Sequence, residues 1–220
     1  MLYKKGSSMH TIQKTEEKIL QAAAELFAER GYAASATRVI AEKAGVNEVT
    51  LFRRFKNKAG ILQALGEKMT EEYSRTFHRA GVARGTAKEI LSNFALQEIE
   101  SAEKNGGLAI RLAFDAQSIP EVKKSLEHNL PRNFEYLTRF MADHQKEGSL
   151  RKDIEPQVLA EAFLGLTSSY VMYKKVMGKG KNPARPEKRD RAVKQLLELF
   201  WTGASAETNT GEKIENQQKP

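Results

Sequence analysis

The chain has 220 residues, of which 40% are hydrophobic and 29% charged, which is enough for one or two compact domains with hydrophobic cores. Cysteine is absent, which excludes disulfides, thiolate nucleophiles and cysteine metal ligands, and no apolar run is long enough to span a membrane. The net charge of +8 favours nucleic acid or an anionic membrane as a partner, with a generic solubility charge as an equal alternative. Residues 1–60 carry eleven Lys and Arg against six Glu, so the positive excess is concentrated there.

The first part of the chain is predicted to be helical after a flexible arm at residues 1–13. This arm has no apolar stretch, so it is not a secretory signal, and Met9 is an alternative start. Thr15 is a candidate cap for the first helix, and Gly31 is placed to end it in the left-handed conformation. The spacing of apolar residues predicts helices over residues 16–30, 38–44, 48–54 and 58–79.

The rest of the chain is also predicted to be helical, after a break at residues 81–85. Apolar spacing and intervening glycines and prolines predict helices over residues 86–104, 108–116, 120–146, 155–177 and 187–201. Pro131 should kink or split the third of these, because proline removes an interior hydrogen bond. Residues 203–220 are polar and predicted to be disordered. The expected fold class is all-α, with an N-terminal domain over residues 14–60 and a helical domain over residues 61–202.

The segment from Thr37 to Lys58 has the pattern of a helix-turn-helix. Gly45 lies where the tight turn needs a positive φ, and Asn47 is a candidate cap for the helix that follows. The residues predicted to be buried are Ile40, Ala44, Val46, Leu51 and Phe55. A polar and basic outer face is left, which fits a major groove, and it consists of Glu48, Val49, Thr50, Phe52, Arg53 and Arg54.

The flanks of this segment offer phosphate ligands. Thr37 and Asn57 are candidate caps of the second and fourth helices, and such helix starts bind phosphate readily. Lys58 lies in the first turn of the fourth helix, where a cation is unfavourable for the helix dipole and a nearby phosphate would explain it. The alternative for the whole segment is an ordinary pair of helices with a solvated, charged face.

A longer pattern includes these residues and runs without a gap from Thr15 to Leu62. It consists of the helix end Leu26 to Tyr32 followed by Thr37, Ile40, Ala41, Ala44, Gly45, Val46, Thr50, Leu51, Phe52, Phe55 and Lys58. The pattern resembles the Tet repressor family of bacterial transcriptional regulators. This resemblance implies an all-helical homodimer, with three N-terminal helices for DNA and a C-terminal helical domain that dimerises and binds a small effector.

The resemblance also implies roles for single residues. The base-edge candidates are Asn47, Glu48, Val49 and Arg53. The DNA-backbone candidates are Thr37, Arg38, Thr50, Phe52, Arg54 and Lys58. Three of these positions depart from the family pattern. Val49 replaces a common glycine and offers an apolar contact to a thymine methyl, Phe52 lacks the hydroxyl of a common tyrosine, and Arg54 is permanently charged where histidine is common. We therefore expect altered contacts rather than lost DNA binding.

The C-terminal helices carry a predicted effector pocket and a predicted dimer interface. The pocket candidates are Phe94, Ile99, Leu108, Arg111, Leu112, Phe134, Leu137, Met141, Phe163 and Tyr170. For all of them except Arg111, plain hydrophobic core is the alternative. Arg111 faces either an acidic ligand or the structural carboxylate of Asp115, four residues later. Small and apolar residues in the last two helices predict a two-fold, four-helix interface, with packing on the monomer core as the alternative. Its candidates are Gly165, Ser168, Ser169, Leu196, Leu199 and Phe200.

No arrangement of residues indicates catalysis, since the four histidines are scattered and no phosphate-binding glycine loop is present, so no cofactor, metal or enzymatic activity is expected. Together with the family resemblance, the sequence predicts a dimeric, cytoplasmic repressor, released from a palindromic double-stranded DNA operator by an apolar or amphipathic effector. It predicts no membrane partner. A protein-interaction module that binds no small molecule is the first alternative, and an all-helical enzyme is the second.

Overall fold

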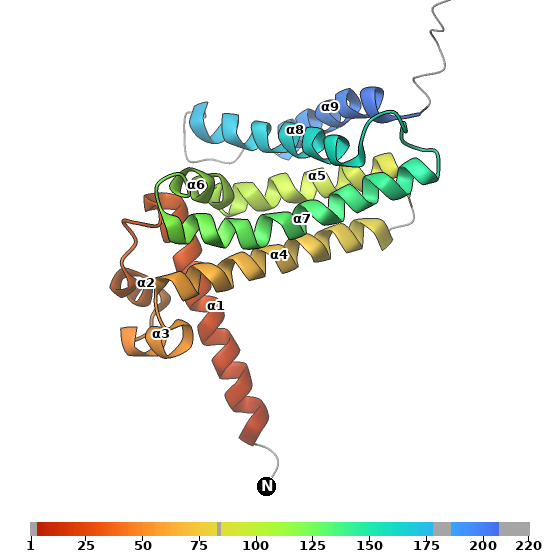
Figure 1. Ribbon diagram of the computed structural model, residues 1–220. Coiled ribbons are helices and arrows are strands. Elements are labelled where there is room, and N and C mark those ends of the chain that lie inside the picture. The colour runs from red at the N-terminus through yellow and green to blue at the C-terminus, as the bar shows by residue number, and fades with distance from the viewer. Residues whose placement is uncertain (1–3, 83–84, 178–185, 207–220) are drawn as a thin grey trace, which may run out of the picture. The chain divides into compact units, whose positions relative to one another are not determined.

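The computed structural model describes residues 4–82, 85–177 and 186–206, and most of them are helical (Figure 1). Extended pairing within these ranges is limited to an isolated bridge between Leu150 and Ser205, so the predicted all-α fold class is confirmed. None of the described helices is apolar over a stretch long enough to cross a bilayer. The helices are α1 (Lys4–Arg30), α2 (Thr37–Ala44), α3 (Glu48–Phe55), α4 (Lys58–Val82), α5 (Ala87–Lys104), α6 (Leu108–Asp115), α7 (Pro120–Lys146), α8 (Pro156–Met177) and α9 (Pro186–Ala204).

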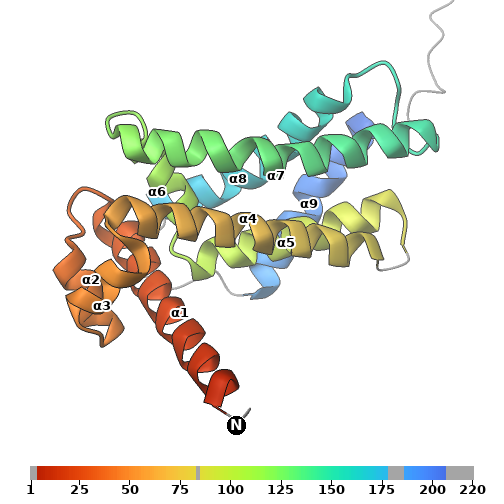
Figure 2. The ribbon, with the colours of Figure 1, turned by 60° about the horizontal axis from the view of Figure 1, so that its bottom comes forward.

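Most helices begin and end close to their predicted residues, and the start of α1 is the exception. Residues 4–13 are helical rather than a flexible arm, and Thr15 lies inside the helix instead of capping it. The segment contains no proline, and a helix that has already formed gains a backbone hydrogen bond with each residue added. The first turns of α1 project past α2 and α3 (Figures 1 and 2).

The helix α7 is continuous through Pro131, so the predicted alternative of two shorter helices is wrong. A proline inside a helix removes one hydrogen bond, whereas packing acts along the whole length of the helix. Val122 before the proline and Leu137 after it are both fully buried. Tertiary packing on each side therefore maintains the helix despite the missing bond.

The C-terminal helix ends later than predicted. α9 continues to Ala204, whose carbonyl accepts a hydrogen bond from the Arg151 N–H at 2.9 Å. Ala204 and Ser205 are both buried, so Gly203 is not the start of a disordered tail. The rest of that predicted tail, residues 207–220, lies outside the described residues.

Contacts divide the chain into two units. Unit 1 consists of residues 1–74 and 100–133, and unit 2 consists of residues 75–99 and 134–220. Unit 1 thus contains α1, α2, α3 and α6 complete, with parts of α4, α5 and α7. The domain boundary predicted after residue 60 stays a prediction of where the DNA-binding part of the chain ends, since the later helix α6 packs in the same core as the N-terminal helices.

The core of unit 1 is apolar and draws on six helices, α1 to α4, α6 and α7. Val46 and Phe55 pack at its margin, and the other residues of the predicted buried set lie inside it, so that set is confirmed. Side chains that are almost completely buried in this core include Ile19, Phe27, Ile40, Leu51, Ile61 and Leu108.

Unit 2 has an aromatic core. The ring of Phe94 lies 5.1 Å from that of Phe77 and 6.1 Å from that of Phe163, and Phe163 lies 5.5 Å from Phe200. Aromatic pairs at such distances each contribute about 0.5–1.5 kcal/mol beyond the area they bury. α8 and α9 lie side by side within this unit (Figure 1).

Candidate nucleic-acid interface

The turn between α2 and α3 is built from two local features that the sequence predicts. Gly45 ends α2 with a φ of 67°, and its N–H is directed to the carbonyls of Ala41 and Glu42. Asn47 precedes α3, where its side-chain Oδ1 accepts a hydrogen bond from the Val49 N–H at 2.8 Å. The predicted positive φ and the predicted cap are both confirmed.

The predicted cap at Thr37 is wrong, whereas the one at Asn57 is confirmed. α2 begins at Thr37 itself, and the Thr37 hydroxyl donates to Glu48 Oε1 at 2.7 Å. A carboxylate is a stronger acceptor than a neutral group, so this bond joins the start of α2 to the start of α3. Asn57 Oδ1 accepts from the Gly60 N–H at 2.8 Å in the first turn of α4.

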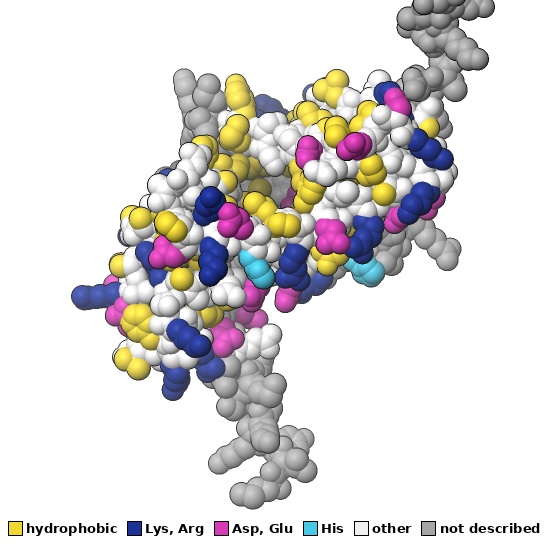
Figure 3. All heavy atoms as spheres, in the orientation of Figure 1, with side chains coloured by type: hydrophobic (Ala, Val, Ile, Leu, Met, Phe, Trp, Pro, Cys, Tyr) yellow, Lys and Arg dark blue, Asp and Glu magenta, His cyan; other side chains and the backbone are white. Residues whose placement is uncertain are grey.

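The outer face of α3 combines apolar and basic side chains. Val49, Phe52 and Arg53 are exposed, and their spacing of three and four residues puts them on one side of the helix, while the exposed Lys56 follows its last residue. Val49 is 72% exposed and Phe52 is 42% exposed. Figure 3 shows hydrophobic side chains over this helix, bordered by Lys and Arg. Arg38 is a further exposed cation in the first turn of α2.

Lys56 is a candidate that reasoning from sequence missed. The predicted helix ends at Arg54, but α3 continues to Phe55 and Lys56 follows it directly. Lys56 has a φ of 63°, a left-handed conformation that non-glycine residues rarely adopt. Strained backbone is often kept at functional positions, and here it belongs to an exposed cation. A signal was available, since Lys56 follows Val49 by two helical turns.

Two predicted contact residues are engaged within the protein. Arg54 is partly buried, and its Nη1 lies 3.5 Å from Oε1 of Glu16 in α1. The Glu48 carboxylate accepts the Thr37 hydroxyl, as described above. The charge that replaces the family's common histidine therefore connects α3 to α1, and DNA contacts by Arg54, Glu48 and the half-buried Thr50 stay predictions.

Lys58 is held by the loop between α1 and α2. Its Nζ donates to the Tyr32 carbonyl at 2.9 Å and lies 4.3 Å from the centre of the Tyr32 ring. Burial lowers the pKa of Lys58, while burial and the nearby charge of Glu121 raise the pKa of Tyr32 to about 12. These partners explain a cation in the first turn of α4 without a phosphate, so phosphate binding by Lys58 stays a prediction.

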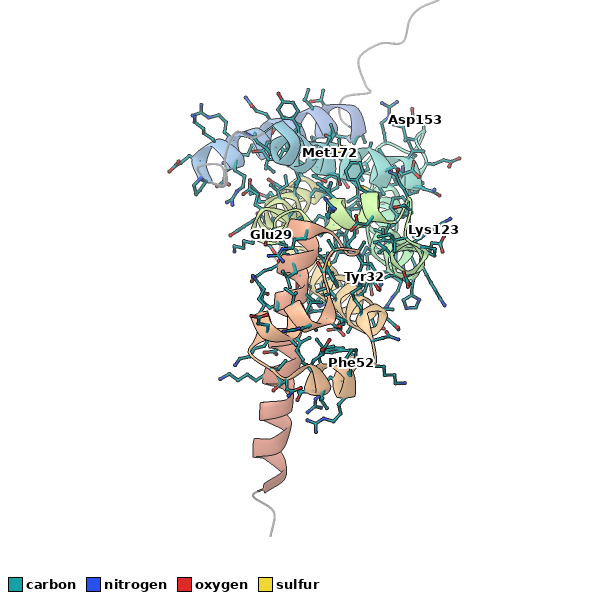
Figure 4. All side chains as sticks on the ribbon, turned by 90° about the vertical axis from the view of Figure 1, so that its left-hand side faces the viewer. Glu29, Tyr32, Phe52, Lys123, Asp153 and Met172 are labelled. Atoms are coloured by element: carbon teal, nitrogen blue, oxygen red, sulfur yellow. The ribbon has the colours of Figure 1, made fainter. Side chains whose placement is uncertain are left out.

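The same loop is held from α6. The Tyr32 N–H donates to Asp115 Oδ2 at 2.7 Å, and Arg111 Nε lies 3.3 Å from Asp115 Oδ1. Arg111 Nη2 also donates to the Arg30 carbonyl at 3.4 Å. The sequence predicts that Arg111 faces either an acidic ligand or the Asp115 carboxylate, and in the structure Arg111 pairs with Asp115. Figure 4 shows Tyr32 and, on α3, Phe52.

Replacing Gly31 by alanine should destabilise the protein by more than the usual cost of its backbone conformation. Gly31 has a φ of +83°, which costs a residue with a Cβ about 1–2 kcal/mol. A Cβ there would also overlap the Arg111 guanidinium, which the contacts with Asp115 and Arg30 hold in place. Urea denaturation measures the loss as a lower midpoint.

Gly148→Ala is the matched control for this substitution. Gly148 has a φ of +85°, but a Cβ there meets no atom within 4 Å. The free energy of unfolding of Gly148→Ala should therefore fall only by the cost of the backbone conformation. Equal losses of unfolding free energy in the two variants would show that the Arg111 contact does not constrain Gly31.

The predicted effector-pocket residues fall in two places. Leu108, Arg111 and Leu112 belong to unit 1, and both leucines lie in its core. The other candidates belong to unit 2, where a hollow of about 10 Å³ beside Ile99 and Phe163 has room for no more than about one water molecule. An effector that binds beside these two residues must therefore displace side chains. The candidates in unit 2 are Phe94, Ile99, Phe134, Leu137, Met141, Phe163 and Tyr170.

The predicted interface residues differ in exposure. Phe200 is 7% exposed and packs on Phe163, so it belongs to the core of its own unit. This agrees with the alternative prediction, in which these residues pack on the monomer core. Leu196 is half-buried. The fully exposed candidates are Gly165, Ser168, Ser169 and Leu199.

Comparison with known proteins gives a consistent result. Residues 19–65 match the model of the bacterial regulatory proteins of the tetR family. The uncharacterized HTH-type transcriptional regulator YvkB of Bacillus subtilis is 50% identical over 54 residues, which cover 24% of this chain and only 29% of that protein. The nucleoid occlusion factor SlmA of Marinobacter nauticus is 30% identical over 147 residues, which cover 66% of this chain and 73% of that protein.

A solved structure extends the likeness beyond the helix-turn-helix. The transcriptional regulator FadR of Bacillus subtilis, in complex with stearoyl-CoA, is 25% identical with a TM-score of 0.71, and the alignment covers 85% of this chain and 98% of that one. The family consists of regulators, not enzymes, which confirms the prediction that this chain is not an enzyme. With its helix-turn-helix in α2 and α3, the chain belongs to the tetR family and is a DNA-binding transcriptional regulator.

Proposed function

We propose that the protein is a homodimeric repressor that leaves its operator when a small-molecule effector binds. The observation that carries this proposal is the outer face of α3, which presents exposed apolar and basic side chains on a helix whose start is joined to α2 by the Thr37–Glu48 bond. Such a helix fits a major groove, and a dimer places two of them one helical turn of DNA apart. The operator is then palindromic, and the protein works on chromosomal DNA in the cytoplasm.

An uncharged stripe on α8 supports the dimer. Val158, Ala162, Gly165, Ser169 and Met172 are all exposed, and they alternate between four and three residues apart. This is the spacing with which two helices pack along their length. Val158 is 47% exposed and Met172, labelled in Figure 4, is 43% exposed. A second helix on this stripe would remove their apolar surface from water.

A matching stripe on α9 completes the proposed interface. Ala192, Leu196, Leu199 and Gly203 follow the same spacing on α9, where the first two are half-buried and the last two are exposed. Leu199 is 70% exposed, which is unusual for a leucine in the middle of a stable helix. Since α8 and α9 lie side by side, their stripes and the two copies in a second chain would form a four-helix interface.

The proposed effector is a long-chain acyl thioester or a molecule of similar shape, an apolar chain with a polar end. Two observations support this class: the aromatic core of unit 2 and the likeness to a regulator solved with stearoyl-CoA. An effector releases DNA only if it binds the two conformations of the protein with different affinity. The bonds from Asp115 and Arg111 to the Tyr32 loop offer a route from α6 to the helix-turn-helix.

Adding stearoyl-CoA to the protein bound to its own upstream DNA should lower the DNA affinity by about tenfold or more, within the range usual for allosteric coupling. Fluorescence anisotropy of the labelled DNA measures the change, and free coenzyme A serves as the control. A thermal shift with stearoyl-CoA in the absence of DNA tests binding by itself, because a ligand of the folded state raises the Tm. A Tm and a DNA affinity that both stay constant would contradict an acyl effector.

A further inference from the structure

The exposed face of α3 includes two apolar side chains, Val49 and Phe52. Val49 is 72% exposed on the first turn of the helix, and Phe52 stands three residues later on the same face at 42% exposure. Together the two side chains form a small apolar patch on one side of the helix, which a surface that binds α3 would cover. Arg53 and Lys56 border them, so the surface that covers them is negatively charged at its edges.

The polar side chains beside Val49 already have partners within the protein. Asn47 Oδ1 accepts the Val49 N–H at 2.8 Å, and Glu48 Oε1 accepts the Thr37 hydroxyl at 2.7 Å. Base recognition through these two oxygens would therefore mean sharing or changing a hydrogen-bond partner at the cap of α3 and at the bond that joins α3 to α2. Val49 needs no such change, because its side chain is already exposed.

Duplex DNA offers an apolar group to such a side chain in the major groove. The C5-methyl of thymine projects there, and aliphatic and aromatic side chains contact it, while cytosine presents an unmethylated ring edge at that position. The ring of Phe52 has no hydroxyl to donate to a phosphate, which leaves packing as its contribution. Arg53 and Lys56 supply the charge that keeps the helix close to the phosphates.

We propose that Val49 and Phe52 are specificity-determining residues that recognise thymine methyl groups in each half-site of the operator. This inference rests on the proposed binding of the outer face of α3 to DNA. It requires thymines opposite the first two turns of α3 in both half-sites.

The test compares the protein's upstream DNA fragment with the same fragment made with deoxyuridine in place of thymidine. Removing a buried methyl group should weaken binding by about fourfold for each methyl contacted, the value expected for burial of one carbon group. The wild-type protein should prefer the thymidine fragment in anisotropy titrations. Val49→Ala and Phe52→Ala should each reduce this preference, and the pair of substitutions should abolish it.

Leu130→Ala is the matched control, because Leu130 is an apolar side chain with 55% exposure on α7, away from α3 in the sequence. It should keep the full preference for thymidine. A wild-type protein that binds both fragments equally and tightly would overturn the inference and leave the proposed DNA binding intact. If the double variant still prefers the thymidine fragment, the preference arises from DNA shape, and this result would also overturn the inference. Failure to bind either fragment would overturn both proposals.

Discussion

The Leu199→Glu variant is expected to be monomeric and to lose operator affinity by a factor of about 100 or more. In the proposed interface, the exposed Leu199 would be covered by the second chain, so the substitution would bury carboxylates among apolar side chains. A monomer binds one half-site only, and linking two binding modules typically adds a factor of 10²–10⁴ to affinity. Sedimentation velocity measures the mass in solution, and anisotropy with the upstream DNA measures the affinity.

Two further variants separate assembly from folding. Gly165→Glu is a second disruption on α8, and a Cβ at Gly165 meets nothing within 4 Å, so the monomer accommodates it. Leu130→Glu changes another exposed leucine, 55% exposed and outside both stripes, and it should remain dimeric. All three variants should keep the helical circular-dichroism spectrum. A dimeric Leu199→Glu protein with unchanged operator affinity would contradict the proposed interface.

The Arg53→Ala variant is expected to weaken operator binding by about 1–3 kcal/mol. Arg53 is exposed between Val49 and Lys56 on the outer face of α3, and no acidic residue in the described part of the chain pairs with it. A base contact would also relax sequence preference, whereas a phosphate contact would weaken all sequences alike. Arg139→Ala, which removes an exposed arginine paired with Glu135 in α7, is the control and should bind normally.

The parts of the interface that sequence predicts are those set by neighbouring residues. Gly45 and Asn47 act within one turn of their own helices, so their φ angle and hydrogen bond follow from residue type. The buried set at Ile40 and Leu51 follows from helical spacing in the same way. Local rules are therefore enough to place α2, α3 and the turn between them.

The parts that sequence does not predict depend on contacts between distant residues. Asp115 accepts from the Tyr32 N–H across 83 positions in the chain, and Glu16 meets Arg54 across 38. Lys58 is the clearest case, because its position suggests a phosphate while the structure supplies the Tyr32 carbonyl. Pairings of this kind arise only when helices pack, and no spacing rule within one helix anticipates them.

The most direct measurement of DNA recognition by α3 is a series of anisotropy titrations of the protein's upstream DNA at increasing KCl concentration. A plot of the logarithm of the wild-type association constant against the logarithm of the salt concentration should be a steep, falling line. Each phosphate that the protein neutralises should contribute about −0.9 to its slope. Arg53→Ala should bind more weakly at every salt concentration, and a smaller slope would assign Arg53 to a phosphate. Salt-independent binding, or identical curves for wild type and Arg53→Ala, would contradict recognition of DNA by this face of α3.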